Sequence, residues 1–428
     1  MRKGLVLGKD IIYSMNCKKT KRNNNVLVVG ASGSGKTRGV VEPNILQAQG
    51  SYIITDPKGN LYEKYRYYLE AKGYRVGKIN FVDPLDSKGY NPFSNIHSTQ
   101  DIHKIAHMIV YGNSGKGSFG TEPFWDAAAE MLLEALIAYL WETGKEISFR
   151  SLGELLKDCD VPEGISSQKA PMDARMEKLK IGNSDSFAAR QYEKFRVGAS
   201  RTMKSVLITI GAALGKYDTP ELRQMFQRNE IRFDRIGEVK TALVVVVSDT
   251  DRSMDVLADL FFTQAMNELC RHADTNCVNS ELPIGVRFIM DDFATNCRIH
   301  EFPRMIASIR SRKISVMLMI QAESQLTESY GNDGRTIIAN CDTYLYFGGN
   351  DVETATAVAK RCDEPLQEIL YMPVGESRIF RRGEKPIIAE IVDLDEFMRD
   401  NRIDLWPDVA FLNFDPAELE RLNQLDVI

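Results

Sequence analysis

Three features that define other classes of protein are missing from this sequence. Its seven cysteines are odd in number and include no C-x-x-C pair, so we expect reduced thiols that serve packing rather than disulfides or zinc ligands. No apolar run approaches the roughly 18 residues of a membrane span, and the N-terminus lacks the hydrophobic core of a signal peptide. An excess of positive charge is also absent, because the net charge is −5. These absences predict a cytosolic globular chain in which any contact with nucleic acid comes from a local patch.

The order of apolar segments predicts two kinds of domain. A chain of 428 residues is too long for one ordinary core. Strand-like runs alternate with helical patterns near both ends, which is typical of a parallel α/β sheet. Between about 101 and 225 the strand-like runs give way to helical periodicity. We therefore predict an α/β nucleotide-binding domain in two parts (1–95 and 232–392), an all-α domain (96–231) and a C-terminal extension (393–428).

A glycine-rich turn follows the apolar strand expected at 26–29 and has the sequence Gly30-Ala31-Ser32-Gly33-Ser34-Gly35-Lys36-Thr37. The spacing G-x-x-x-x-G-K-T is that of a phosphate-binding P-loop. Glycine permits positive φ and lets backbone N–H groups approach phosphate oxygens. Lys36 is expected to reach the β- and γ-phosphates of ATP, and the Thr37 hydroxyl to bind Mg²⁺. A chance glycine-rich turn is the alternative, but such a match is expected on the order of once in a hundred chains of this length.

Paired acids end a second apolar strand, which is expected at 285–290. Opposite a P-loop lysine, Asp291 is expected to hold Mg²⁺ through water and Asp292 to polarise the attacking water. The next strand, 314–320, ends at Gln321, which could sense the γ-phosphate, position water or be a surface amide at the start of a loop. Acids end many strands, so the paired acids indicate a nucleotide site only because a P-loop precedes them in the chain.

Other residues leave alternatives open. Asp56 and Asp83 also end expected strands, and each either faces a ligand or caps a turn. His103 and His107 have the i, i+4 spacing of some metal ligands, but no nearby acid or cysteine completes a site, so packing is the favoured interpretation. The basic stretch 190–204 could contact DNA, a partner protein or only solvent.

Together the motifs resemble one family, the coupling proteins of type IV secretion systems, which are the DNA-transfer ATPases of conjugation. The resemblance covers about residues 25–391. Besides the P-loop it rests on Thr55-Asp-Pro-Lys-Gly-Asn-Leu-Tyr62, Asn91-Pro-Phe93, Ile289-Met-Asp-Asp-Phe-Ala294, Ser308-Ile-Arg-Ser-Arg312, Ile320-Gln-Ala-Glu-Ser-Gln-Leu326 with Tyr330-Gly331, and Phe347-Gly-Gly-Asn-Asp-Val-Glu-Thr-Ala355.

The resemblance implies a RecA-like P-loop domain that is interrupted by an all-α domain. It also implies a homo-hexameric ring when active, possible monomers otherwise, and ATP with Mg²⁺ bound between subunits. Implied partners are single-stranded or double-stranded DNA, relaxase or relaxosome proteins, and components of the secretion channel. By the family's pattern Asp291 is the Walker B acid and Gln321 the strand-end sensor. Arg310 matches the arginine that reaches a neighbour's γ-phosphate, its alternative role being to cap helix-end carbonyls.

Two departures from the family's pattern affect the expected function. The family usually has Asp-Glu where this chain has Asp291-Asp292, and the shorter acid sets its carboxylate back by roughly 1.5 Å, one carbon–carbon bond. The family also usually carries N-terminal membrane helices, so we expect placement at the inner face of the membrane through a removed anchor or a partner. The leading hypothesis is an ATP-driven translocase and substrate receptor for conjugation. The second is a nucleotide-gated recruitment platform with little ATP turnover, and a DNA pump of chromosome segregation is less favoured.

Overall fold

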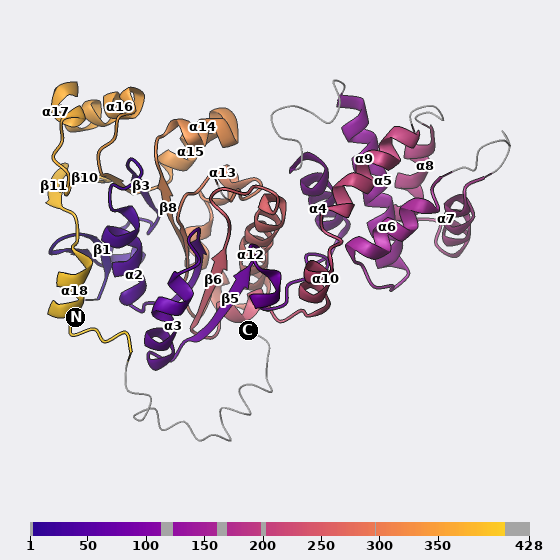
Figure 1. The fold of residues 1–428 in the computed structure, drawn as a ribbon, viewed down its shortest axis with the longest axis horizontal. Coiled ribbons are helices and arrows are strands. Elements are labelled where there is room, and N and C mark those ends of the chain that lie inside the picture. The colour runs from indigo at the N-terminus through magenta and orange to yellow at the C-terminus, as the bar shows by residue number, and fades with distance from the viewer. Residues whose placement is uncertain (1–2, 113–122, 161–168, 198–202, 296, 407–428) are drawn as a thin grey trace, which may run out of the picture. The chain divides into compact units, whose positions relative to one another are not determined.

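The computed structural model describes residues 3–112, 123–160, 169–197, 203–295 and 297–406 (Figure 1). These residues form two compact units. The α/β unit comprises Met1–Val82, Glu230–Arg252 and Ala265–Ile428, and the helical unit comprises Asp83–Asn229 and Ser253–Gln264, in each case as far as the chain is described. Residues 407–428 of the predicted C-terminal extension lie outside the described residues.

A nine-stranded sheet organises the α/β unit, in the order β11-β10-β9-β3-β8-β7-β4-β6-β5. Every pairing from β9 to β5 is parallel, whereas β10 and β11 are antiparallel additions at one edge. The strands are β3 (Val26–Val29), β4 (Ser51–Asp56), β5 (Arg75–Asn80), β6 (Thr241–Val246), β7 (Val286–Met290), β8 (Ile314–Ile320), β9 (Thr343–Tyr346), β10 (Glu376–Arg381) and β11 (Ile387–Glu390), with a separate antiparallel pair β1 (Leu5–Gly8) and β2 (Ile11–Tyr13). The predicted mostly parallel α/β sheet is confirmed.

Both faces of this sheet are covered. On one face Val26 and Val28 of β3 share a core with Ile45 and Tyr65 from the following helices. Leu27, which points to the opposite face because side chains alternate along a strand, is buried as well. Burial on both faces explains why the central strands are almost entirely apolar.

The helices of the α/β unit connect these strands. They are α1 (Cys17–Thr20), the π-type turn η1 (Thr37–Val41), α2 (Glu42–Leu46), α3 (Leu61–Ala71), α11 (Phe233–Ile236), α12 (Asp255–Asn276, whose first turns belong to the helical unit), α13 (Phe302–Met305), α14 (Ser324–Tyr330), α15 (Gly334–Ala339), α16 (Val352–Cys362), α17 (Leu366–Leu370) and α18 (Leu394–Asp400). Short 3₁₀ turns lie at η3 (Val278–Ser280), η4 (Ile309–Arg312) and η5 (Gly331–Asp333).

The helical unit contains helices and a single 3₁₀ turn among its described residues, as predicted. Ser148 caps the N-terminus of α6 by accepting from the N–H of Ser151, and Thr219 caps α10 in the same way. The elements are η2 (Pro84–Asp86), α4 (Thr99–Gly112), α5 (Pro123–Glu142), α6 (Phe149–Lys157), α7 (Pro171–Gly182), α8 (Phe187–Val197), α9 (Met203–Gly215) and α10 (Pro220–Gln227). No helix within the described ranges is both long and apolar enough to cross a membrane.

Two local predictions differ from the structure. The i, i+3, i+4, i+7 spacing of Phe302, Met305, Ile306 and Ile309 predicts a single helix. This prediction is wrong, because α13 stops at Met305 and a 3₁₀ turn follows at η4, with Ser308 donating back to the Met305 carbonyl. Strand β10 was not predicted, because four of its six residues are polar. Its arginines Arg378 and Arg381 are nevertheless buried, and ion pairs with Glu364 and Glu384 accommodate their charge.

Candidate functional site: a P-loop facing an acidic strand end

The P-loop connects β3, a central strand, to the helical turn that begins at Thr37. Backbone hydrogen bonds fix it to both neighbouring strands: Gly30 donates to the carbonyl of Ile320 (3.2 Å) and Ala31 to that of Gly348 (3.0 Å). Gly33 and Gly35 have φ of +76° and +90°, which only glycine adopts without strain. At Gly30 the reason is space, since an added Cβ would lie 2.6 Å from Ser34 Oγ. The glycine pattern therefore has a physical cause at three positions: backbone conformation at Gly33 and Gly35, and space at Gly30.

Lys36 lies beneath this loop. The residue is 7% exposed, and its Nζ donates to the carbonyl oxygens of Gly30 (2.6 Å) and Ala31 (3.0 Å). Burial lowers the pKa of the Lys36 ammonium, while the negative charges of Asp292 and Asp291 oppose that shift. The loop thus holds a buried cation whose direct contacts are neutral carbonyls.

The structure brings Asp291 to the end of the P-loop. Asp291 follows β7, and its Oδ2 accepts a 2.6 Å hydrogen bond from the hydroxyl of Thr37. Its own carbonyl accepts from Thr55 on the adjacent strand β4 (3.0 Å). Burial raises the pKa of Asp291, and the Thr37 bond works against this rise. Two hard oxygen donors consequently lie side by side where the sequence placed Mg²⁺.

Asp292 extends the acidic strand end into a turn. It has a φ of +53°, a left-handed conformation that aspartate tolerates better than most residues. The next residue, Phe293, is fully buried and its N–H donates to the Met319 carbonyl, which fixes the backbone behind the acid. The charge of Asp292 acts on Lys36, where it opposes the lowering of the pKa that burial causes.

Gln321 follows β8 at the same sheet edge and is exposed. Its backbone N–H donates to Oε1 of Gln325 (2.7 Å), and Nε2 of Gln325 donates to Oγ1 of Thr295 (3.1 Å). A second glutamine therefore ties the end of β8 to the loop after the paired acids. Gln325 was not among the predicted site residues, although it lies in the segment Ile320–Leu326 that contains Gln321.

Arg310 does not join this group. It lies in η4, which precedes β8, so it is at the opposite edge of the sheet from the P-loop. There it lines a hollow of about 980 Å³ that carries four further basic side chains, Lys18, Lys21, Lys313 and Arg382.

The two aspartates that sequence left open both cap turns. Oδ2 of Asp56 accepts from the N–H of Leu61 at the start of α3 (2.6 Å), and Asp83 accepts from the N–H of Leu85 (3.2 Å). In the basic stretch 190–204, Arg190 donates to the Asp185 carbonyl (2.6 Å) and Arg196 pairs with Asp173 (3.1 Å). Arg201 of that stretch lies outside the described residues.

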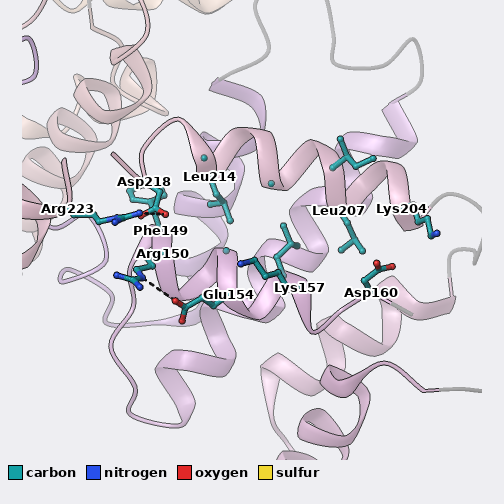
Figure 2. A pocket seen from close by; sticks show the side chains of 15 residues that line it. Phe149, Arg150, Glu154, Lys157, Asp160, Lys204, Leu207, Leu214, Asp218 and Arg223 are labelled. Carbon is teal, nitrogen blue, oxygen red and sulfur yellow. Dashed lines mark hydrogen bonds and ion pairs between the residues drawn. The ribbon is translucent and has the colours of Figure 1, made fainter. Parts of the chain in front are cut away.

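A separate hollow of about 690 Å³ lies within the helical unit, between α6 and α9 (Figure 2). Leu207 and Leu214 supply apolar surface there, and charged groups border it, including the Arg150–Glu154 and Arg223–Asp218 pairs. Its side chains offer both apolar contact and charge of either sign.

A P-loop at the carboxyl edge of a mostly parallel sheet, facing an acid from a nearby strand, is the architecture of RecA-like P-loop proteins. The sequence profile of the family described as Type IV secretory system Conjugative DNA transfer matches residues 1–364. The chain belongs to this family, as the sequence motifs predicted.

Relatives and solved structures agree with this assignment. The chain is 25% identical over 354 residues to VirD4 of Rhizobium radiobacter, covering 79% of this chain and 48% of that protein. It is 23% identical over 367 residues to TraG of Escherichia coli, covering 78% and 54%. The chain thus spans about half the length of these relatives.

Its fold is similar to that of the conjugative coupling protein TrwBdeltaN70 in complex with sulphate, with a TM-score of 0.64, 16% identity and coverage of 92% of this chain and 90% of that chain. VirB4 of Thermoanaerobacter pseudethanolicus is also similar, with a TM-score of 0.54, 14% identity and coverage of 93% and 99%.

Proposed function

We propose that this chain is an ATP-hydrolysing coupling protein that recruits DNA, or a protein–DNA substrate, to a type IV secretion channel and moves it during conjugative transfer. The observation that carries the proposal is the 2.6 Å hydrogen bond from Thr37 to Asp291, which joins the P-loop to the acid 254 residues further along. Membership of the conjugative DNA transfer family supplies the biological setting.

The residues at the site fit MgATP. Thr37 Oγ1 and Asp291 Oδ2 are the hard oxygen ligands that Mg²⁺ prefers. Ser34 Oγ is buried without a hydrogen-bond partner among the described residues, and Lys36 is a buried cation in contact with carbonyls. A bound phosphate group would accept a hydrogen bond from Ser34 Oγ and would neutralise the charge of Lys36. TrwB has been solved with the ATP analogue ADPNP and with ADP and Mg²⁺.

Each side chain then has a defined task. ATP with Mg²⁺ supplies the phosphoryl group and the divalent charge. The backbone N–H groups of Gly30–Thr37 bind phosphate oxygens, and Lys36 neutralises their charge. Asp291 orients the Thr37 hydroxyl and holds the cation. Asp292 accepts a proton from the attacking water, and Gln321 positions that water.

Arg310 completes the site from a neighbouring subunit, because its position excludes it from its own P-loop. Such a composite site requires an oligomer, and the active form that we propose is a homo-hexamer at the inner face of the cell membrane. Relaxosome proteins and the channel are the proposed partners, and the membrane contact is supplied by an anchor or by a partner.

A DNA-stimulated ATPase assay tests the proposal. We expect turnover that rises with protein concentration and with added single-stranded DNA, and its loss in Lys36→Ala. Absence of stimulated turnover at every protein concentration, with Lys36→Ala equal to wild type, would refute the motor.

The second candidate is a nucleotide-gated recruitment platform with little turnover. Asp292 in place of the family's usual glutamate favours it, and the hollow between α6 and α9 offers a surface for a protein substrate (Figure 2). Nucleotide-dependent binding of a relaxase, unchanged in Asp292→Asn but lost in Leu207→Asp, would support this function over the motor.

A further inference from the structure

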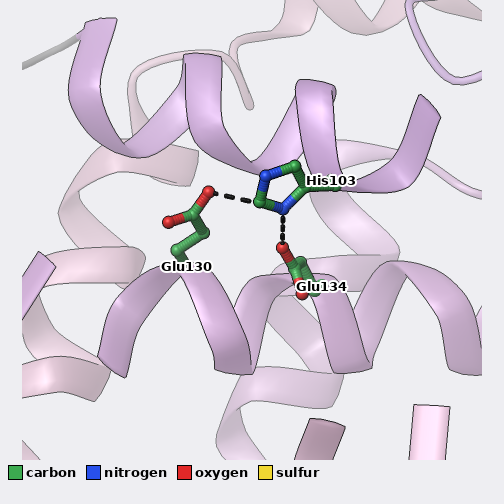
Figure 3. A group of neighbouring side chains, drawn as sticks. All are labelled: His103, Glu130 and Glu134. Carbon is green, nitrogen blue, oxygen red and sulfur yellow. Dashed lines mark hydrogen bonds and ion pairs between the residues drawn. The ribbon is translucent and has the colours of Figure 1, made fainter. Parts of the chain in front are cut away.

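We propose that the helical unit contains a Zn²⁺ site formed by His103 and His107 of α4 with Glu130 and Glu134 of α5. Figure 3 shows His103 between the two glutamates. The ligand atoms of His103, Glu130 and Glu134 all lie within 4.8 Å of one another. His103 Nδ1 is 3.6 Å from Glu130 Oε1 and hydrogen-bonds Glu134 Oε1, and His107 Nδ1 is 3.0 Å from Glu130 Oε1.

The expectation that no acid lies near the two histidines is wrong, because Glu134 and Glu130 contact them. Each helix contributes an i, i+4 pair, which puts its two side chains on one face. His103 meets Glu134 and His107 meets Glu130, so the two helices run antiparallel at this point. The acids escaped detection because they stand 23 and 31 residues away in sequence.

The spacing of the ligand atoms suits one small cation. Zinc binds imidazole nitrogen and carboxylate oxygen at about 2.0–2.2 Å in tetrahedral geometry, which separates ligand atoms by roughly 3.3 Å. The distances of 3.0 and 3.6 Å lie on either side of that value. The ligand atoms of His103, Glu130 and Glu134 lie within 4.8 Å of one another, so side-chain adjustments of up to about 1.5 Å would bring them to the zinc spacing. His107, whose Nδ1 is 3.0 Å from Glu130 Oε1, is the proposed fourth ligand.

The surroundings point to more than a simple ion pair. Asp126, one turn before Glu130 on α5, is 7% exposed, and its Oδ1 has no hydrogen-bond partner among the described residues. The charge of Asp126 also acts on Tyr111, which lies one turn beyond His107 on α4. Burial is the main cause that raises the pKa of the Tyr111 hydroxyl, and the negative charges of Glu130 and Asp126 raise it further. Three carboxylates therefore line the face of α5 that meets the histidines, and a divalent cation would offset their charge.

Supporting contacts orient the acids and leave a path for the ion. Gln191 of α8 donates to the second oxygen of Glu134, as partners of metal-binding carboxylates commonly do. The side chain of Glu134 is 3% exposed, but that of His103 is 61% exposed, so the ion can enter from solvent on the histidine side. Imidazole ligands favour zinc over magnesium.

The test uses the full chain, stripped of metal with a chelator and free of nucleotide. Titration with Zn²⁺ against a chromophoric competitor should show one high-affinity site per chain that excess Mg²⁺ does not displace. Substituting Co²⁺ should give the visible absorption of a four-coordinate ion. The double variant His103→Ala, His107→Ala should lose the site, and Glu134→Gln, which keeps size and polarity, should weaken zinc binding by roughly tenfold or more.

A matched control distinguishes the proposed site from an ordinary His–Glu pair. His272 lies 3.1 Å from Glu238, and His272→Ala should leave zinc affinity unchanged. Far-ultraviolet circular dichroism checks that each variant is folded. No zinc binding by the wild type, or binding that is equal in wild type, Glu134→Gln and a folded double variant, would overturn the proposal. Because nucleotide is absent and ATPase activity is not the readout, this result is independent of the proposed function.

Discussion

Arg310 and Gln321 lie at opposite ends of the same strand, β8. The strand has seven residues, which at about 3.3 Å per residue separates its ends by roughly 23 Å. Gln321 is at the edge that carries the P-loop, whereas Arg310 is exposed at the other edge. Within one chain this arginine cannot contact a phosphate bound by Lys36. A catalytic role for Arg310 therefore requires a second chain.

The first prediction concerns this arrangement. Arg310→Ala should lower DNA-stimulated turnover by about 10³-fold or more, as expected for an arginine finger supplied in trans. ATP binding by the monomer should stay intact. Mixing Arg310→Ala with Lys36→Ala, each inactive alone, should restore part of the activity, because mixed rings contain some intact composite sites. Steady-state ATPase assays of the mixtures measure this directly.

Arg312→Ala is the matched control. Arg312 belongs to the same 3₁₀ turn but pairs with Asp274 (2.7 Å), so its loss should leave turnover near the wild-type value. Weakened monomer binding in Arg310→Ala, or failure of the mixture to recover any activity, would contradict the assignment in trans.

The second prediction concerns Thr37 and the cation. Removing its hydroxyl in Thr37→Ala eliminates the hydrogen bond to Asp291 and one oxygen ligand for Mg²⁺. The Mg²⁺ concentration needed for half-maximal turnover should rise by about tenfold, on the scale of one lost charged hydrogen bond. Thr37→Ser retains the hydroxyl and should behave like wild type. Equal Mg²⁺ dependence in the alanine and serine variants would exclude the hydroxyl as a ligand.

The third prediction addresses the short acid at position 292. Asp292→Asn should lower kcat by about 10²-fold or more, because the general base is lost, and leave the nucleotide Kd unchanged. Asp292→Glu should raise kcat, since its carboxylate extends one bond further. Its φ of +53° suits glutamate less well, so the same variant should lose about 1 kcal/mol of unfolding free energy. If the asparagine variant turns over as fast as wild type, Asp292 is not the base.

Sequence patterns predicted the strands and the loop whose conformation depends on neighbouring residues in the chain. The central strands are apolar because both faces are buried, and the P-loop glycines meet backbone demands at fixed spacing. What sequence could not supply was the pairing of residues far apart in the chain. Asp56 proved to be a cap once Leu61 was seen to donate to it, and the histidines of α4 acquired acidic partners only through the packing of α5. Strand β10 was hidden because its arginines are accommodated by ion pairs that its own sequence does not reveal.

Gln325 makes two hydrogen bonds at the nucleotide site that the sequence did not predict. Its amide spans two segments: Oε1 accepts the N–H of Gln321 at the end of β8, and Nε2 donates to Thr295 in the loop that follows Asp292. Strand β8 pairs directly with β3, which leads into the P-loop. A displacement of the backbone at the end of β8 can therefore be transmitted to the loop after Asp292 through the side chain of Gln325.

The last prediction follows from this link and treats Gln325 as a positioning residue. Gln325→Ala should lower kcat by about tenfold, the effect of one or two lost hydrogen bonds, while the KM for ATP stays constant because the P-loop contacts are intact. Gln325→Glu keeps an acceptor for Gln321, and its second oxygen can accept from the Thr295 hydroxyl, so a kcat near the wild-type value is expected. Thr295→Val removes that hydroxyl but leaves the bond to Gln321, so an intermediate kcat is expected. A rise in KM instead of a fall in kcat would show that Gln325 supports nucleotide binding and not the geometry of the hydrolytic step.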